Sequence, residues 1–145
     1  MKTRTRSVPA TASGAPCPCG LPAAYADCCG RFHQADGVGN FPATPDAERL
    51  MRSRYSAYAL GLMDYLRFTW HPSTRPHALE PEDSGLRWLG LEVRRCWASG
   101  PDEAWVEFVA RCKHQGRAIR LHERSRFLCH QGRWFYVDGL EGKGS

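Results

Sequence analysis

The sequence predicts an α+β protein in which helices cover one face of a curved antiparallel sheet. Between residues 44 and 70, apolar side chains recur at intervals of three and four, which is the spacing of one buried helix face. From residue 86 onward, four runs typical of strands follow one another, separated by the stretches SGPD, HQG and HQG. Connections this short exclude the crossovers that parallel strands need, so we expect an antiparallel meander.

The 145 residues are enough for one core of ordinary size, which we expect in residues 46–145. Residues 1–15 are rich in Ser, Thr, Ala and Pro with scattered basic side chains, and they predict a disordered basic tail. Residues 35–45 combine Gly, Asn and Pro and predict a linker. The intervening residues 16–34 hold four of the seven cysteines and form a candidate metal-binding module.

The helical region should begin at Thr44, which can cap the first turn, with Pro45 in the first helical position. Gly61 is expected to bend or divide the helix, and the second piece should run to Trp70, because Pro72 disfavours helix at the residue before it. The apolar positions that should build the buried face are Ala47, Leu50, Met51, Tyr55, Tyr58 and Leu62.

The cysteines of the module follow the pattern C-x-C-x8-C-C, and a histidine follows shortly after. The chain has no secretory signal pattern and no run of the roughly 18 apolar residues that a membrane helix needs. We therefore expect a cytoplasmic protein, in which thiols stay reduced and closely spaced cysteines indicate a metal rather than disulfides.

Four thiolates suit a structural zinc ion, which prefers a tetrahedron of soft or borderline ligands. The expected ligands are Cys17, Cys19, Cys28 and Cys29. Since adjacent Cys28 and Cys29 must both point inward, His33 is an alternative fourth ligand in place of Cys29. A segment this short has little core, so the metal should supply most of its folding free energy, on the order of 10 kcal/mol.

The sequence also resembles a known family. CPCG, followed by CC with Tyr25 between, resembles the SEC-C motif, a small zinc module; Leu21 and Pro22 stand where that module usually has Ser, and the ligand frame is intact. Residues 49–76 and 121–139, together with this module, resemble the YchJ family of UPF0225 proteins, in which SEC-C precedes an NTF2-like domain.

The resemblance implies a cone of helices wrapped by a bent antiparallel sheet, and it implies no settled activity. SEC-C modules elsewhere resemble contact surfaces for translocation and ribosomal partners, which implies a protein or ribonucleoprotein partner near translation or export. NTF2-like domains resemble frequent dimerisers through the sheet, so the resemblance also allows a homodimer.

Strand alternation should turn Glu123 and Ser125 into the cone and the arginines beside them outward. A carboxylate in an apolar cavity takes up a proton or finds a cation. Glu123 is therefore either half of a structural ion pair with Arg52 or Arg54, or an acid or base in a small-molecule pocket, which makes it a weak catalytic candidate. The expected cavity residues are Arg52, Arg54, Tyr55, Tyr58, His71, Glu123 and Ser125.

The outward face carries a basic row formed by Arg120, Arg124 and Arg126, which is either a solvated surface or a nucleic-acid contact. The net charge of +5 permits an acidic partner without choosing one. The remaining thiols, at Cys96, Cys112 and Cys129, should be small buried side chains.

The favoured function is that of a zinc-binding adaptor, possible partners being proteins or ribonucleoproteins of translation or export. Two alternatives are open: a small-molecule binding protein or enzyme that uses the cone, and a basic nucleic-acid-binding protein. The sequence assigns no enzymatic activity, because it lacks a G-x-x-x-x-G-K loop and the strand–turn–helix context of a nucleophile elbow.

Overall fold

The computed structural model describes residues 15–79 and 85–141. The predicted basic tail therefore lies outside the described residues, except for residue 15. The elements, in chain order, are η2 (Tyr25–Asp27), η3 (Cys29–Phe32), α1 (Ala47–Leu60), α2 (Met63–Phe68), β1 (Leu86–Gly100), β2 (Glu103–His114), β3 (Arg117–His130) and β4 (Arg133–Glu141). No helix in the described ranges is long and apolar enough to cross a membrane.

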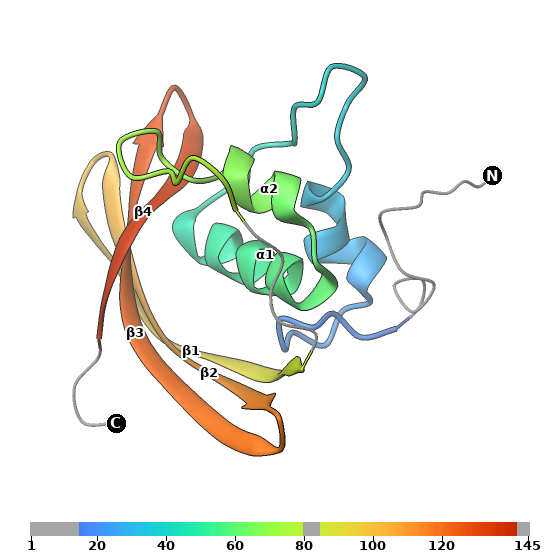
Figure 1. Cartoon of the computed structure of the whole chain (residues 1–145). Coiled ribbons are helices and arrows are strands. Elements are labelled where there is room, and N and C mark those ends of the chain that lie inside the picture. The colour runs from blue at the N-terminus through green and yellow to red at the C-terminus, as the bar shows by residue number, and fades with distance from the viewer. Residues whose placement is uncertain (1–14, 80–84, 142–145) are drawn as a thin grey trace.

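The four strands form one sheet in the order β1-β2-β3-β4, and every neighbouring pair is antiparallel. Both HQG stretches close two-residue hairpins, and Gln115 and Gly116 each have a positive φ, as a type I′ turn requires. The pairing of β1 with β2 shifts register at three places, and such bulges bend a strand. The sheet consequently curves around α1 and α2 (Figure 1), so the predicted α+β class and meander are confirmed.

The main core lies between the concave face of the sheet and α1. Leu50 and Tyr55 of α1 pack there with Val106 and Phe127 of the sheet. A second cluster joins α1 to α2 through Leu66 and to the N-terminal segment. The predicted buried face of the helix is thus divided between two cores.

The start of α1 differs from the prediction by two residues. Asp46, not Thr44, is the N-cap, and its carboxylate accepts a hydrogen bond of 2.8 Å from the backbone N–H of Arg49. Thr44 is buried and donates its hydroxyl to the carbonyl of Asp46 instead. Gly61 ends α1 in the left-handed conformation, with φ of 75°, and so divides the helical region into two helices.

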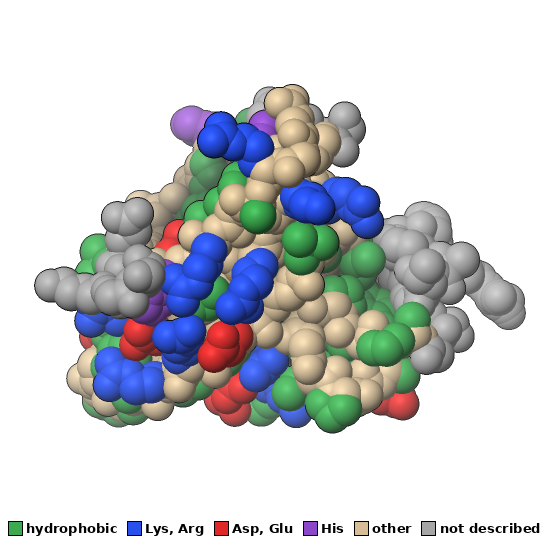
Figure 2. All heavy atoms as spheres, turned by 90° about the horizontal axis from the view of Figure 1, so that it is seen from below, with side chains coloured by type: hydrophobic (Ala, Val, Ile, Leu, Met, Phe, Trp, Pro, Cys, Tyr) green, Lys and Arg blue, Asp and Glu red, His purple; other side chains and the backbone are tan. Residues whose placement is uncertain are grey.

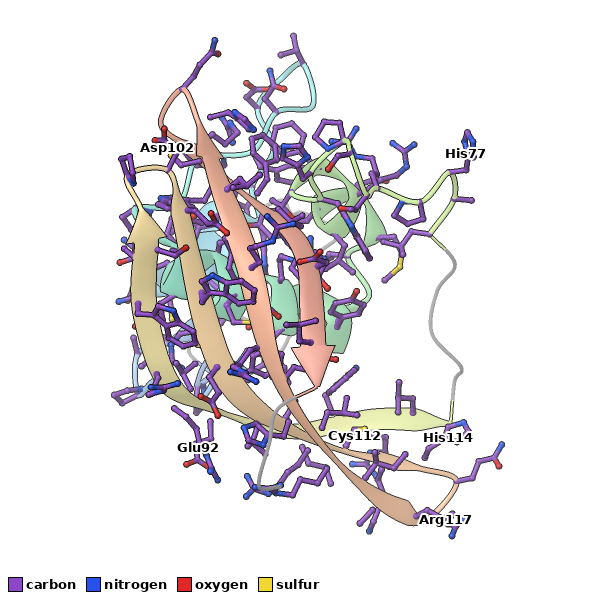
Figure 3. The ribbon with its side chains drawn as sticks, turned by 90° about the vertical axis from the view of Figure 1, so that its left-hand side faces the viewer. His77, Glu92, Asp102, Cys112, His114 and Arg117 are labelled. Atoms are coloured by element: carbon purple, nitrogen blue, oxygen red, sulfur yellow. The ribbon has the colours of Figure 1, made fainter. Side chains whose placement is uncertain are left out.

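The second helix, α2, ends at Phe68, two residues before the predicted end. Trp70 instead forms a parallel bridge with Tyr136 of β4. This bridge turns the following segment toward the β3–β4 hairpin, whereas the β2–β3 hairpin, where His114 and Arg117 lie, projects at the far end of the sheet from Asp102 (Figure 3). The two ends of the curved sheet therefore have different neighbours.

Candidate metal centre

The four cysteines of the module lie on two short turns, and their sulfur atoms converge on one point. Between Cys17 and Gly20 the backbone closes a turn through a 3.2 Å hydrogen bond, and Gly20 has a φ of 96°, which favours glycine. Cys28 separates η2 from η3 with φ −124° and ψ −114°. This break in the helical path lets the sulfurs of the adjacent Cys28 and Cys29 face the same centre.

All four sulfur atoms lie within 4.8 Å of one another, and all four cysteines are at most 4% exposed. The sulfurs of Cys19 and Cys28 are 3.7 Å apart. A tetrahedral zinc ion with Zn–S bonds of about 2.3 Å has sulfur–sulfur edges of about 3.8 Å. The donor set therefore fits a tetrahedral ion, and four protein ligands would leave no position open for a substrate.

Hydrogen bonds among the cysteines shift the pKa values of their thiols in opposite directions. Contacts with Cys19 and Cys29 lower the pKa of Cys17, and the contact with Cys17 raises the pKa of Cys19 to about 11. A hydrogen bond with Cys17 likewise raises the pKa of Cys29. Protons on these thiols compete with a metal ion, so metal affinity should fall as the pH falls.

Two arginines of α1 face the cysteine cluster. The Nη1 atom of Arg49 donates to the sulfur of Cys28 over 3.7 Å, and Nη1 of Arg52 donates to the carbonyl of Cys19 over 2.9 Å. Four thiolates around a divalent ion would leave a net charge of −2, which these cations would offset. Sequence reasoning missed Arg49 altogether, although its spacing of three from Arg52 on a helix was a usable signal.

Arg52 does not lie in the cone, where it was expected. It pairs with Glu48 over 2.9 Å on the side of α1 that faces the metal centre. The reason is helical geometry, because residues two apart point about 200° away from each other around the axis. Arg52 and Arg54 consequently lie on opposite faces of α1.

His33 lies outside the cysteine cluster and has other partners. Its Nε2 atom is 2.9 Å from the carbonyl of Ser53, so Nε2 carries the hydrogen, and Nδ1 accepts from the hydroxyl of Tyr25 over 2.5 Å. Burial lowers the pKa of His33 to about 4. The structure thus brings Cys29, and not His33, together with the other three cysteines.

The module packs directly on α1. The hydroxyl of Ser56 lies 3.5 Å from the sulfur of Cys17, and Leu60 and Leu91 cover the cluster. A Cβ atom at Gly20 would meet the carbonyl oxygen of Leu91 at 3.1 Å, so a side chain there would crowd the contact between the module and β1. Figure 1 shows the N-terminal segment (blue) beside α1 and close to β1.

A separate cavity of about 270 Å³ lies in the cone between α1 and the sheet. Of the expected cavity residues, it is lined by Arg54, Tyr55, Tyr58, Glu123 and Ser125. Burial raises the pKa of Tyr55 to about 12, so its hydroxyl stays protonated at neutral pH. The concave face is crowded at Gly139, where an added Cβ would come within 3.0 Å of Oε1 of Glu123.

Arg54 is the buried cation of this cavity. Its Nη1 atom donates to the carbonyl of Leu66 at 2.8 Å and to the hydroxyl of Thr69 at 2.7 Å. The guanidinium also lies 4.5 Å from the ring centre of Tyr136. Burial lowers the pKa of Arg54 below its ordinary value. The cone therefore places a cation and the carboxyl of Glu123 around one small, mainly apolar space.

His71 lies outside the cone. The bridge from Trp70 to β4 carries the next residue to the β3–β4 hairpin, where Nε2 of His71 is 2.9 Å from Nε2 of His130. The loop that holds His71 follows the end of α2 and leaves the space between α1 and the sheet. Helix and strand periodicity cannot place such a loop residue, which explains why the prediction failed for it.

Arg126 of the basic row has acidic partners, and so does Arg95 on β1. Arg126 lies 3.7 Å from Glu103 and 3.3 Å from Asp138, and Arg95 lies 3.2 Å from Glu107. Acidic side chains are interspersed among the basic ones on the face shown in Figure 2. This pairing leaves less free positive charge than the sequence suggested.

The thiols outside the cluster have different exposures. Cys112 is buried, Cys129 is half-buried and Cys96 is exposed, with its sulfur 3.6 Å from a carboxylate oxygen of Glu48. The expectation of burial therefore holds fully for Cys112 alone among these three.

Comparisons with known proteins cover both parts of the chain. The family model described as YchJ, middle NTF2-like domain, matches residues 46–139. A UPF0225 protein of Methylibium petroleiphilum is 63% identical over 124 residues, which cover 86% of this chain and 87% of that protein. A UPF0225 protein of Chromobacterium violaceum is 59% identical over 130 residues, which cover 87% and 93%.

Two solved structures share the architecture. The solution structure of a SEC-C motif containing protein from Rhodopseudomonas palustris has a TM-score of 0.72 and 31% identity, covering 88% of this chain and 99% of that one. The crystal structure of a SEC-C motif containing protein from Psychrobacter arcticus has a TM-score of 0.72 and 29% identity, covering 92% and 86%. The NTF2-like fold and the SEC-C resemblance are thereby confirmed.

The donor set predicts one zinc ion per chain in protein purified under reducing conditions, as measured by native mass spectrometry. Cys28→Ser should lose the ion to a chelator that leaves the wild type loaded, because one corner of the tetrahedron is removed. The matched control is Cys129→Ser, which changes a thiol outside the cluster and should retain zinc. Metal-free wild-type protein, or equal retention by both variants, would contradict this assignment.

Burial of neutral His33 predicts that stability depends on pH. Between the ordinary pKa of 6.5 and the native value of about 4, the unfolded chain binds a proton that the native chain does not. The free energy of unfolding should therefore fall as the pH falls through this window, by about 3 kcal/mol in all.

Urea unfolding of wild type and His33→Gln between pH 7.5 and 5, both with excess zinc, measures this contribution. Glutamine can donate to Ser53 and accept from Tyr25, so the variant should show the smaller loss of stability at low pH. Loss of zinc affects both proteins and cancels in the difference. Identical slopes would refute the role assigned to His33.

Proposed function

The chain belongs to the YchJ family of UPF0225 proteins, and on this premise we propose that it is a zinc-dependent interaction protein. In this proposal, a structural metal centre shapes the surface that a protein or ribonucleoprotein partner contacts. The observation that carries the proposal is the closed, buried set of four thiols packed against α1. A set with no open ligand position suits folding rather than metal catalysis.

Zinc, when bound, supplies folding free energy to a segment that has little core of its own. The chain's own residues then attach this segment to the larger domain. Arg52 ties it through the carbonyl of Cys19, and His33 ties it through the carbonyl of Ser53. The opposite side of the module stays exposed and is the surface proposed to meet the partner; it includes Pro22, Ala23, Ala26, Asp27 and Arg31.

A partner in translation or protein export agrees with the SEC-C resemblance and with the net charge of +5. The outer sheet face is less suited to nucleic acid than the sequence suggested, because Arg126 and Arg95 have carboxylate partners. A contact made through the module should therefore survive moderate salt, whereas binding dominated by phosphate contacts falls steeply with salt.

Co-sedimentation with ribosomes from a bacterial lysate, across a salt series, tests this proposal. We expect the wild type to sediment at moderate salt and Cys28→Ser to remain in the supernatant. Ala26→Glu is the second variant, because it changes an exposed module residue, should keep zinc, and should still lose binding. Absence of wild-type binding, or binding unchanged in both variants, would reject the proposal.

A second candidate function is binding of a small molecule in the cone, and the observation that favours it is the cavity shared by Arg54 and Glu123. A ligand of the 270 Å³ cavity should raise the melting temperature in a thermal-shift screen of small carboxylic acids and amides. Glu123→Gln should abolish this shift while the protein stays folded. If the screen yields no shift, or if Glu123→Gln keeps it, the cone has no such role.

A further inference from the structure

An open pocket of about 620 Å³ lies outside both the cone and the metal centre. Three segments form it: α2, the loop after α2, and the β3–β4 hairpin. Figure 1 shows this loop (light green) beside the hairpin (red), and the contact between His71 and His130 confirms that they touch. The volume falls within the range of about 300–1,000 Å³ that is typical of small-molecule sites.

Three arginines, one from each segment, line this pocket: Arg67, Arg75 and Arg133. Backbone carbonyls hold each of them in place. Arg67 donates to His77 at 3.3 Å, Arg75 donates to Trp70 at 3.1 Å, and Arg133 donates to Phe41 at 2.8 Å. Figure 3 shows His77 in the segment that follows α2.

These arginines differ from those on the outer sheet face in their charge balance. Within residues 15–79 and 85–141, none of the three forms an ion pair, although the carboxylate of Asp64 also borders the pocket. A guanidinium has five N–H donors, and the carbonyl bonds use only one on each arginine. The pocket therefore offers several positioned donors and a net positive charge.

The hydrogen bonds of His71 determine which ring nitrogen of His130, at the rim, carries a hydrogen. The backbone N–H of Ser73 donates to Nδ1 of His71, so the hydrogen of neutral His71 is on Nε2. That hydrogen points at Nε2 of His130, 2.9 Å away, which must then accept it. Neutral His130, which lines the pocket, consequently carries its own hydrogen on Nδ1.

Aromatic rings give the pocket an apolar part. The guanidinium of Arg133 lies 5.2 Å from the ring centre of Phe68, which further fixes its position. Phe135 lines the same space and lies edge-on to His71 at 6.1 Å between ring centres. A flat ring of a ligand can pack on such an aromatic wall. A planar guanidinium group can donate two parallel N–H hydrogen bonds to two oxygens of one phosphate.

We propose that the pocket of Arg67, Arg75 and Arg133 binds a small phosphate ester that carries an aromatic ring, of the class of nucleoside monophosphates. The phosphate would lie on the arginines, and the ring would pack on Phe135. Phosphate alone would fill only a fraction of the 620 Å³, which is why a larger ligand is expected. This site is independent of the metal centre and of the partner surface of the module.

Isothermal titration of the zinc-loaded, full-length protein with AMP, inorganic phosphate and adenosine tests the proposal. AMP should bind, whereas phosphate and adenosine should each bind at least tenfold more weakly, because each lacks half of the ligand. Arg75→Gln and Arg67→Gln should each raise the dissociation constant for AMP at least tenfold. Arg126→Gln, which changes an arginine of the outer sheet face, is the matched control and should leave binding unchanged.

Three results would overturn the proposal: no measurable AMP binding, AMP binding that Arg75→Gln and Arg67→Gln leave unchanged, or phosphate binding as tight as AMP binding. Circular dichroism of each variant excludes unfolding as the cause of a loss. Because the titration uses no macromolecular partner, its failure is distinguishable from a failure of ribosome co-sedimentation.

Discussion

The contact between the cysteine module and α1 is the constraint on which the rest of the structure depends. One face of α1 packs on the sheet through Leu50 and Tyr55, and another face meets the module through Arg49, Arg52 and Ser56. Ser56 is polar and yet fully buried, which a helix with a single packed face would not require. The cysteine cluster therefore packs on one side of α1, and the core of the sheet packs on another.

The same arrangement separates three regions with different chemistry. The thiols lie beside α1, and the small cavity of Arg54 and Glu123 lies between α1 and the sheet. The arginine pocket lies between α2, the loop that follows it and the β3–β4 hairpin. The bridge between Trp70 and β4 places the loop after α2 beside that hairpin and not in the cone. Curvature of the sheet and the short connection at Gly61 thus determine which residues can meet.

Much of this was predictable from local sequence patterns. Period-two alternation, the two HQG turns and the cysteine spacing are local signals, and they were enough for the meander, its turns and the candidate ligands. Most of what failed depends on long-range packing. Thr44 and Asp46 are both good caps, and only the burial of Thr44 decides between them. The position of His71 follows from the bridge to β4, which no local pattern contains. The position of Arg52 is different, because helical periodicity alone separates it from Arg54.

Hydrogen–deuterium exchange of the amides of α1, with and without zinc, tests the central claim most directly. If the metal centre stabilises α1, removal of zinc should speed exchange both in residues 17–33 and in α1 through Ser56, while β2 and β3 stay protected. Faster exchange in residues 17–33 alone, with α1 unchanged, would contradict the account, because the module would then be an appendage on a helix that the sheet already stabilises.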